Sequence, residues 1–432
     1  MPQTIDLAAE RRKAHEARLQ TSRTAAGITD PVERARAAVQ ATLATDHQAL
    51  VEDIEAHRGE LEHTIADLVA RQPLTEDERG RLEAELGQYL TGYGPVQPLI
   101  DDPSVTEILV NAFDDVWFER NGLLHKAGIS FPSRASYEAF AHRLAERAHK
   151  PLDETNPILN AELPDHSRLN VTIYPVTDQP AINLRKAAQV TRSYDPAAFV
   201  ATGAATEEFM QTYLWGVRSM ANFLICGPTG SGKTTLLRIG TEYGVPASQR
   251  IITAEDIHEV NAQHPHFLSM QKVDRTSVQI SLTDVLHASL RKRPDRIYVG
   301  EILGDEAAAM LMAVAAGHNG LLATMHAGSP RQAMFLLVIR ALLGGLALPP
   351  DYLRDLLHES LDFLVFVSRD FETGQRRVTS MVEVGESRSA EPFRTLFRWN
   401  GERLEHLQDP STELINRLVQ ERGARPLGEV SA

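Results

Sequence analysis

The sequence predicts an α/β fold, in which a C-terminal domain built around a glycine-rich loop follows a small α+β domain and a helical N-terminal extension. Three observations lead to this prediction. An apolar run at residues 223–226 leads through the glycine-rich loop into a helical segment. Two further apolar runs, at 250–254 and 295–299, are followed by acidic residues, as strands that end at a binding site are. Residues 1–90 instead carry helical spacing without strand signals.

Composition places the chain among ordinary globular proteins. Of its 432 residues, 43% are hydrophobic and 24% are charged, so we expect two folded domains besides the extension. The longest apolar stretches, residues 307–317 and 341–350, are shorter than the roughly 20 residues that a membrane-spanning helix needs. The charged N-terminus lacks the apolar segment of a secretory signal. We therefore expect a cytoplasmic protein.

Charge and cysteine content exclude other classes of protein. Lysine and arginine total 44 against 58 acidic residues, which gives a formal net charge of -14. Such an acidic chain is a poor candidate for broad binding to phosphate backbones, so no specific nucleic-acid partner is expected. The one cysteine, Cys226, lies in an apolar run. This excludes a disulfide framework or a cysteine-rich zinc module within the chain, and we expect a buried thiol.

The expected elements divide the chain into four parts. Thr75 and Glu78 form a capping box ahead of a helix, and helical spacing continues to about residue 90. Gly94-Pro95 breaks that pattern, and Asn121-Gly122 predicts a hairpin between two strands. The helical extension fits a bundle resting on its own domain as well as it fits a partner-binding arm. The predicted parts are a helical extension (residues 1–90), an α+β domain (91–190), a linker (191–206) and the C-terminal α/β domain (207–432).

The glycine-rich segment from Gly227 to Thr234 reads GPTGSGKT, and the strand before it and the helix after it are the context of a phosphate-binding loop. Its glycines let backbone N–H groups close around phosphates at a helix N-terminus. We expect Lys233 to reach the β- and γ-phosphates of ATP and the Thr234 hydroxyl to ligate Mg²⁺. The predicted nucleotide-binding residues are Gly227, Pro228, Thr229, Gly230, Ser231, Gly232, Lys233, Thr234 and Thr235.

Hydrolysis also needs groups that position metal and water, and three further strand ends supply candidates. Glu255 ends the first of them, and Glu301 follows Gly300 at the second. Gly300 stands where the common motif has a metal-binding aspartate, so we expect Glu255 to join Thr234 at Mg²⁺. Glu301 is then left to orient the attacking water. His326 follows the third strand and is expected to sense or stabilise the γ-phosphate.

With a phosphate loop, an acidic box, an atypical second strand motif and a histidine box in this order, the chain resembles the type II/IV secretion ATPase superfamily. The stretch LRKRPD at 290–295, followed by Val299-Gly300-Glu301, narrows the resemblance to the CpaF/TadA pilus-assembly branch, close to the type IV secretion ATPases. The resemblance covers roughly residues 92–385. Leu303 and Gly328 depart from the family pattern, at positions that usually hold arginine and asparagine.

This resemblance implies a RecA-like fold for the C-terminal domain and a homo-hexameric ring at the inner face of the cytoplasmic membrane. The ring would turn ATP hydrolysis into mechanical work on inner-membrane platform proteins, during assembly of a tight-adherence (Flp, type IV-like) pilus or a related secretion machine. The arginines that the family carries in its N-terminal domain match Arg168 and Arg185. Both are expected to reach the nucleotide from that domain.

Two other functions stay open. A ring ATPase of a conjugative or effector-exporting type IV secretion system shares nearly all of these motifs. A scaffold that binds nucleotide with little turnover belongs to a different class, and it ranks third because Glu255 and Glu301 are both present.

Overall fold

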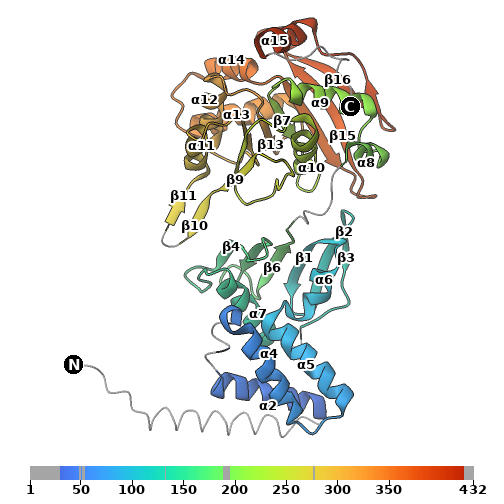
Figure 1. The fold of residues 1–432 in the computed structure, drawn as a ribbon, viewed down its shortest axis with the longest axis vertical. Helices are drawn as coiled ribbons and strands as arrows, with labels where there is room; N and C mark the ends of the chain where they lie inside the picture. The colour runs from blue at the N-terminus through green and yellow to red at the C-terminus, as the bar shows by residue number, and fades with distance from the viewer. Residues whose placement is uncertain are drawn as a thin grey trace, which may run out of the picture.

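The computed structural model describes residues 30–47, 50, 54–131, 133–187, 195–275 and 278–422. Three groups of elements follow one another along its long axis (Figure 1): a set of helices, an antiparallel six-stranded sheet, and a nine-stranded sheet with its helices. Residues 1–29 of the predicted extension and 191–194 of the predicted linker lie outside the described residues. No described helix combines the length and the apolar character needed to cross a membrane.

The first group is a set of helices that bury a common apolar core. Leu61, Ile65, Leu82 and Leu86 meet in this core at helical spacing, so each helix turns one apolar stripe inward. The amide of Thr75 donates to the Glu78 carboxylate, and the amide of Glu78 donates to the Thr75 hydroxyl, which confirms the predicted capping box. The helices are α2 (Pro31–Asp46), α4 (Ile54–Ala70) and α5 (Glu76–Thr91).

The second group, called the N-domain below, is a sheet with the strand order β3-β2-β1-β6-β5-β4. Asn121 and Gly122 both have positive φ, 53° and 80°, as the predicted two-residue hairpin between β2 and β3 requires. Helix α7 packs on the sheet, where the buried Tyr137 hydroxyl hydrogen-bonds the carbonyls of Val110 and Pro180. The elements are η1 (Gly94–Val96), α6 (Gln97–Asp101), β1 (Val105–Ala112), β2 (Asp115–Arg120), β3 (Leu123–Lys126), α7 (Arg134–Arg147), β4 (Ile158–Glu162), β5 (Arg168–Thr172) and β6 (Ala181–Arg185).

The third group, called the C-domain below, has the strand order β17-β16-β15-β14-β7-β13-β12-β8-β9. The strands from β14 to β9 in this order run parallel, and the other three add an antiparallel edge. The strands are β7 (Phe223–Cys226), β8 (Ile251–Glu255), β9 (Phe267–Gln271), β12 (Arg296–Val299), β13 (Leu322–Met325), β14 (Phe363–Arg369), β15 (Arg376–Val384), β16 (Phe393–Trp399) and β17 (Leu404–His406).

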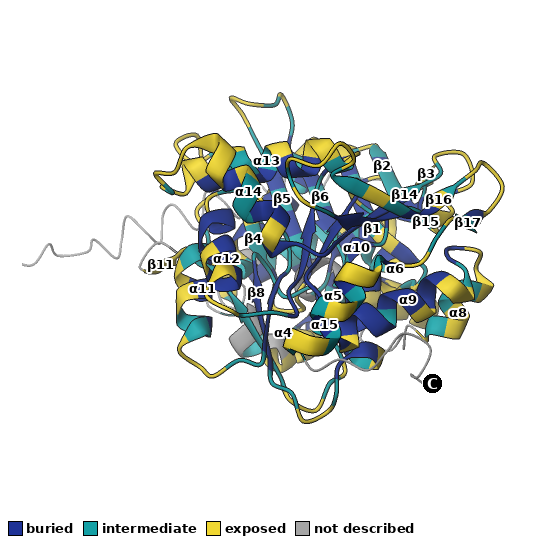
Figure 2. Ribbon diagram, turned by 90° about the horizontal axis from the view of Figure 1, so that it is seen from above, coloured by how far each residue is buried: buried dark blue, intermediate teal, exposed yellow. Residues whose placement is uncertain are grey.

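Helices cover the two faces of this sheet and form one apolar core on each. Strands β7, β12 and β13 are buried along their whole length, as strands of parallel sheets covered on both faces are. Their neighbour β8 is buried in the same way (Figure 2). Cys226, the last residue of β7, is fully buried as predicted. The helices are α8 (Pro196–Ala201), α9 (Glu207–Arg218), α10 (Lys233–Ile239), α11 (Leu282–Leu290), α12 (Glu306–Ala315), α13 (Pro330–Leu343), α14 (Pro350–Ser360) and α15 (Thr412–Arg422). A separate hairpin is formed by β10 (Val273–Arg275) and β11 (Val278–Ile280).

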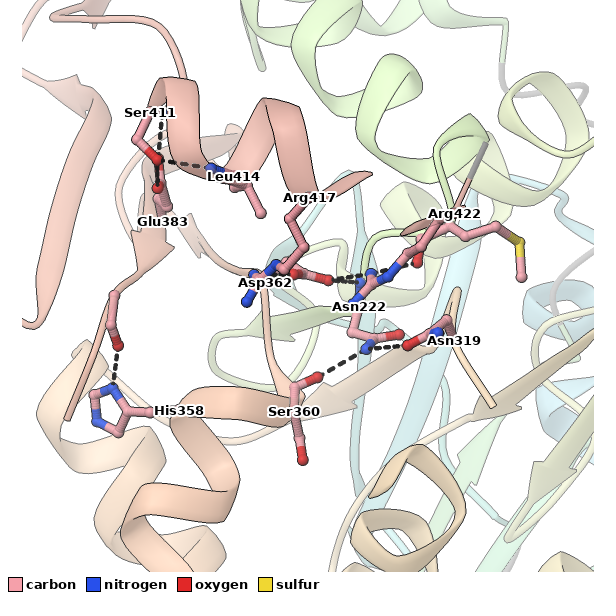
Figure 3. Close-up of polar contacts among 12 residues, drawn as sticks. Asn222, Asn319, His358, Ser360, Asp362, Glu383, Ser411, Leu414, Arg417 and Arg422 are labelled. Atoms are coloured by element: carbon pink, nitrogen blue, oxygen red, sulfur yellow. Dashed lines mark hydrogen bonds and ion pairs between the residues drawn. The ribbon is translucent and has the colours of Figure 1, made fainter. Parts of the chain in front are cut away.

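The C-terminal helix α15 is fastened to the sheet by a buried polar network (Figure 3). Arg417 and Arg422 reach from α15 to the two oxygens of Asp362, at 2.6 Å each. Asp362, which is fully buried, also accepts the backbone amide of Asn222 at 2.7 Å. The Asn222 side chain in turn accepts the amide of Leu321. Asn222, Leu321 and Asp362 directly precede β7, β13 and β14. The network therefore connects α15 to the amino ends of three neighbouring strands.

The N-domain and the C-domain meet where two hairpin turns touch. A Cβ atom added to Gly122, in the turn after β2, would lie 2.9 Å from the carbonyl oxygen of Gly374, in the turn between β14 and β15. This backbone approach leaves room only for glycine. Beside it, Glu119 of β2 pairs with Arg369 of β14 at 2.7 Å, and both side chains are largely buried. A charged, desolvated contact therefore joins the two domains.

Candidate functional site

The carboxyl ends of four parallel strands meet at one edge of the C-domain sheet. β7 lies beside β13, β13 beside β12, and β12 beside β8, all in the same direction. Ligands of open α/β sheets bind at this edge because the loops that leave the strands converge there. The phosphate loop follows β7, Glu301 follows β12, and His326 follows β13. The structure thus brings together residues that are far apart in the sequence.

A cavity of about 450 Å³ lies between this edge and the N-domain. The phosphate loop forms one wall of it, and α10 begins at Lys233, so the backbone N–H groups of the helix's first turn have no partners within the helix. The predicted loop residues that line the cavity are Thr229, Gly230, Ser231, Gly232, Lys233, Thr234 and Thr235. Gly227 and Pro228 lie behind them, and their carbonyls accept hydrogen bonds from the Lys233 ammonium at 3.0 and 3.2 Å.

Lys233, Glu301 and His326 form a polar cluster in the cavity. The Lys233 ammonium lies 3.4 Å from the Glu301 carboxylate, and His326 Nε2 lies 3.0 Å from the same oxygen. Burial lowers the pKa of Lys233, and Glu301 opposes that effect. Burial and the nearby Lys233 charge also lower the pKa of His326, which favours a neutral ring that donates from Nε2 to Glu301. Glu301 is therefore held by one cation and one neutral donor.

Glu255, which the sequence predicts as a metal ligand, is almost fully buried and does not line this cavity. Its Oε1 accepts the hydroxyls of Thr253 and Ser269, and its Oε2 accepts the amides of Glu259 and Val260, at 2.6 to 2.8 Å. A carboxylate offers about four acceptor sites, and these contacts use them. They favour a role for Glu255 in positioning the loop after β8 over the predicted role at Mg²⁺.

Gly300, in the second strand motif, packs against the same carboxylate side chain. A Cβ atom at Gly300 would lie 3.0 Å from Cγ of Glu255, a tight contact that the Glu255 side chain would have to relieve by a small shift. The carbonyl of Gly300 also accepts the Thr324 hydroxyl at 2.5 Å. Gly300 therefore lies close to both the Glu255 side chain and Thr324 of the neighbouring strand.

Glu259 is a cavity residue that the sequence reasoning did not identify. It lies four residues beyond the end of β8, and its carboxylate contacts Arg168 at 2.8 Å and Arg185 at 3.8 Å. The sequence signal for Glu259 is a second acidic residue four positions after Glu255, in the segment EDIHE at 255–259. The hydrogen bond from the Glu259 amide to the Glu255 carboxylate then holds this residue near the sheet edge.

Arg168 and Arg185 line the cavity from the N-domain side. They are direct neighbours on β5 and β6, so two positive charges face one another across the strands, which is unfavourable without an anion nearby. Glu259 of the C-domain supplies that anion. The sequence-predicted Arg168, Arg185, Lys233, Glu301 and His326 therefore share one cavity, which Glu255 does not line.

The oxygen atoms at this cavity fit a magnesium ion bound with a nucleotide. The Thr234 hydroxyl and the carboxylates of Glu259 and Glu301 are hard oxygen donors, which Mg²⁺ prefers, and the ion usually takes few protein ligands besides phosphate oxygens. Among the described residues, no group of three or more histidine, cysteine or acidic side chains is arranged to hold a metal on its own. Thr234 would hold the ion, together with the phosphates.

A family model described as type II/IV secretion system protein matches residues 89–342. This chain belongs to that family. The matched range of this type II/IV secretion system protein holds Arg168, Arg185, Lys233, Glu301 and His326. It ends before β14 begins, so Arg369, which also lines the cavity, lies beyond it.

Relatives of this type II/IV secretion system protein are found in several bacteria. A Mycobacterium tuberculosis protein named for conjugal transfer is 32% identical over 315 residues, which are 70% of this chain and 86% of that protein. Protein VirB11 of Agrobacterium fabrum is 28% identical over 306 residues, 63% of this chain and 87% of that protein. Among solved structures, the VirB11 ATPase from the Brucella suis type IV secretion system in complex with sulphate is 24% identical, with a TM-score of 0.38, and the match covers 69% of this chain and 94% of that chain.

Proposed function

We propose that this protein hydrolyses ATP, acts as a homo-hexameric ring, and powers assembly of a tight-adherence pilus or a related secretion machine. The observation that carries the proposal is the cavity between the domains. There the phosphate loop and Lys233 face Arg168 and Arg185 of the N-domain, with Glu259 and Glu301 between them. Cations from two domains around a phosphate-binding loop suit a ligand that carries several phosphate charges.

The arrangement supports hydrolysis as well as binding. The loop N–H groups and Lys233 hold the β- and γ-phosphates, and Mg²⁺ bound with the nucleotide neutralises charge on their oxygens. Glu301, fixed by His326, orients a water for attack on the γ-phosphorus and accepts its proton. The bond to the oxygen that bridges the β- and γ-phosphorus atoms breaks, and ADP and phosphate leave.

Movement follows from the position of the arginines. Arg168 and Arg185 belong to a different domain from the phosphate loop, so a γ-phosphate that they contact ties the two domains together. Loss of that phosphate removes the tie, which is a common way for hydrolysis to drive domain motion. We propose that inner-membrane platform proteins receive this motion at the cytoplasmic face of the membrane.

The direct test is phosphate release by the purified full-length chain with ATP and Mg²⁺. Lys233→Ala should abolish nucleotide binding or turnover, because it removes the charge nearest the β- and γ-phosphates. Lys272→Ala is a matched control, since Lys272 pairs with Asp256 outside this cavity. A wild-type chain that binds ATP without hydrolysing it would instead support the nucleotide-dependent scaffold.

A type IV secretion or conjugation ATPase is the second candidate. The name of the Mycobacterium tuberculosis relative, which refers to conjugal transfer, favours it. The two functions differ in their partners, because a DNA-moving motor is expected to hydrolyse ATP faster in the presence of DNA. Stimulation by double- or single-stranded DNA would favour the conjugation role, and stimulation by a pilus platform protein would favour the pilus role.

A further inference from the structure

We propose that Arg369 is a further nucleotide-binding residue, which contacts the phosphate chain of the bound nucleotide and joins it to Glu119 of the N-domain. The proposal rests on the proposed function, because it assumes that a nucleoside triphosphate occupies the phosphate loop. Arg369 lies outside the range that the family model matches, and no sequence motif marks it.

The position of Arg369 follows from the order of the strands. β14 runs parallel to and next to β7, and Phe366 pairs with Cys226 in the register. Arg369 at the end of β14 therefore lies beside the phosphate loop that follows β7. A Cβ atom on Gly230 of this loop would lie 3.2 Å from Arg369 Nη1, so the guanidinium packs directly against the loop backbone.

The guanidinium has hydrogen-bonding capacity that the protein leaves unused. Among the described residues, Arg369 forms one ion pair, in which Nη1 lies 2.7 Å from the Glu119 carboxylate, and its buried Nε has no hydrogen-bond acceptor. An arginine carries five donors in a planar fork that matches phosphate oxygens, and a buried donor without a partner is unfavourable. Phosphate oxygens in the cavity would accept hydrogen bonds from guanidinium donors that Glu119 does not use.

Glu119 is held so that it can fix Arg369 in place. Its Oε1 accepts the Thr106 hydroxyl at 2.7 Å, and its Oε2 accepts from Arg369. Burial acts to raise the pKa of Glu119, but the hydrogen bonds from Thr106 and Arg369 outweigh it and the pKa is lowered. The carboxylate therefore stays ionised, and Arg369 can bridge an N-domain anion and a phosphate anion.

Two substitutions separate phosphate binding from a purely structural ion pair. Arg369→Gln should weaken binding of a fluorescent ATP analogue by about 10- to 100-fold, because it removes charge-assisted hydrogen bonds to phosphate. Glu119→Gln should do the opposite and tighten binding by about 2- to 10-fold, since the unneutralised guanidinium then has only the phosphates as anionic partners. A purely structural pair would give losses of similar size in both variants, and that result would overturn the proposal.

Matched controls exclude a general effect of charge. Arg377 lies on the same hairpin, pairs with Asp370 at 3.0 Å and does not line the cavity, so Arg377→Gln should bind the analogue as the wild type does. The loss in Arg369→Gln should be similar for ATP and GTP analogues, because the two share their phosphates. A loss confined to ATP would assign Arg369 to the base and contradict the proposal.

Failure of the inference can be told from failure of the proposed function. If the wild type binds no nucleotide, or Lys233→Ala binds as the wild type does, the proposed function fails. If binding depends on Lys233 while Arg369→Gln binds like Arg377→Gln, only the inference fails. Should Glu119→Gln not fold, Arg369→Lys keeps a charge opposite Glu119, and its affinity should fall between those of the wild type and Arg369→Gln.

Discussion

Under the proposed function, Glu301 orients the attacking water. We expect Glu301→Gln to bind ATP normally and to hydrolyse it about 100-fold or more slowly, because the amide cannot accept the proton of the water. Steady-state phosphate release and fluorescent-nucleotide binding measure the two properties separately. Asp256→Asn is the control, because Asp256 does not line the cavity. Normal hydrolysis by Glu301→Gln would move the role to Glu259, another carboxylate that lines the cavity.

Site residues that directly follow a strand were predictable from the sequence. Site residues that a loop returns to the sheet edge were not. Glu301 and His326 come within two residues of the ends of β12 and β13, so strand signals alone bring them to one sheet edge. Glu259 depends on the Glu255 carboxylate, which holds the amides of Glu259 and Val260. No periodicity in the sequence reports such a loop conformation, so the sequence alone does not place Glu259 at the cavity.

At the scale of elements, strands β5 and β6 deliver Arg168 and Arg185 to the cavity. Each arginine replaced by alanine should lower turnover by about a thousand-fold, because a positive charge from another domain stabilises the transferring phosphoryl group. Folding, oligomer mass and ADP affinity should stay close to those of the wild type, measured side by side. Arg120→Ala is the control, since Arg120 pairs with Asp102 outside the cavity. Turnover at the parent rate in both variants would make these arginines ordinary surface charges.

Helix α15 supplies a second prediction at this scale. Asp362→Ala should lower the free energy of unfolding of the C-domain by about 3–5 kcal/mol, because it leaves Arg422, whose side chain is 9% exposed, without its buried anion. Urea denaturation followed by circular dichroism measures the change. Asp351→Ala breaks the exposed pair with Arg354 and should cost less than about 1 kcal/mol. Equal midpoints for the two variants would show that the network of Figure 3 does not hold the helix.

The elements themselves were predictable to different degrees. The hairpin at Asn121-Gly122 was predictable from the sequence, because few residue pairs adopt positive φ at two successive positions. The order of the C-domain strands was not predictable, because an apolar run does not indicate which other strand it pairs with in the sheet. The position of β14 beside β7 matters for the site, because it places Arg369 against the phosphate loop.

At the scale of the whole molecule, the proposed function requires assembly. Light scattering with ATP and Mg²⁺ should give a mass of about 287 kDa, six times the 47.8 kDa of one chain, because a head-to-tail interface that closes forms a ring. The Lys233→Ala variant tests whether the ring depends on nucleotide. A strict monomer of the wild type at micromolar concentration under these conditions would contradict the proposed ring.

The burial of Cys226 allows the proposed movement between the N-domain and the C-domain to be measured by single-molecule spectroscopy. This is the one cysteine in the sequence, it is fully enclosed, and burial raises the pKa of its thiol, so a maleimide dye has neither access nor thiolate to react with. Cysteines introduced at exposed positions such as Glu154 in the N-domain and Arg331 in the C-domain would be labelled without removing the native one. Energy transfer between two dyes would then show whether the two domains move relative to one another during turnover, as the proposed function requires.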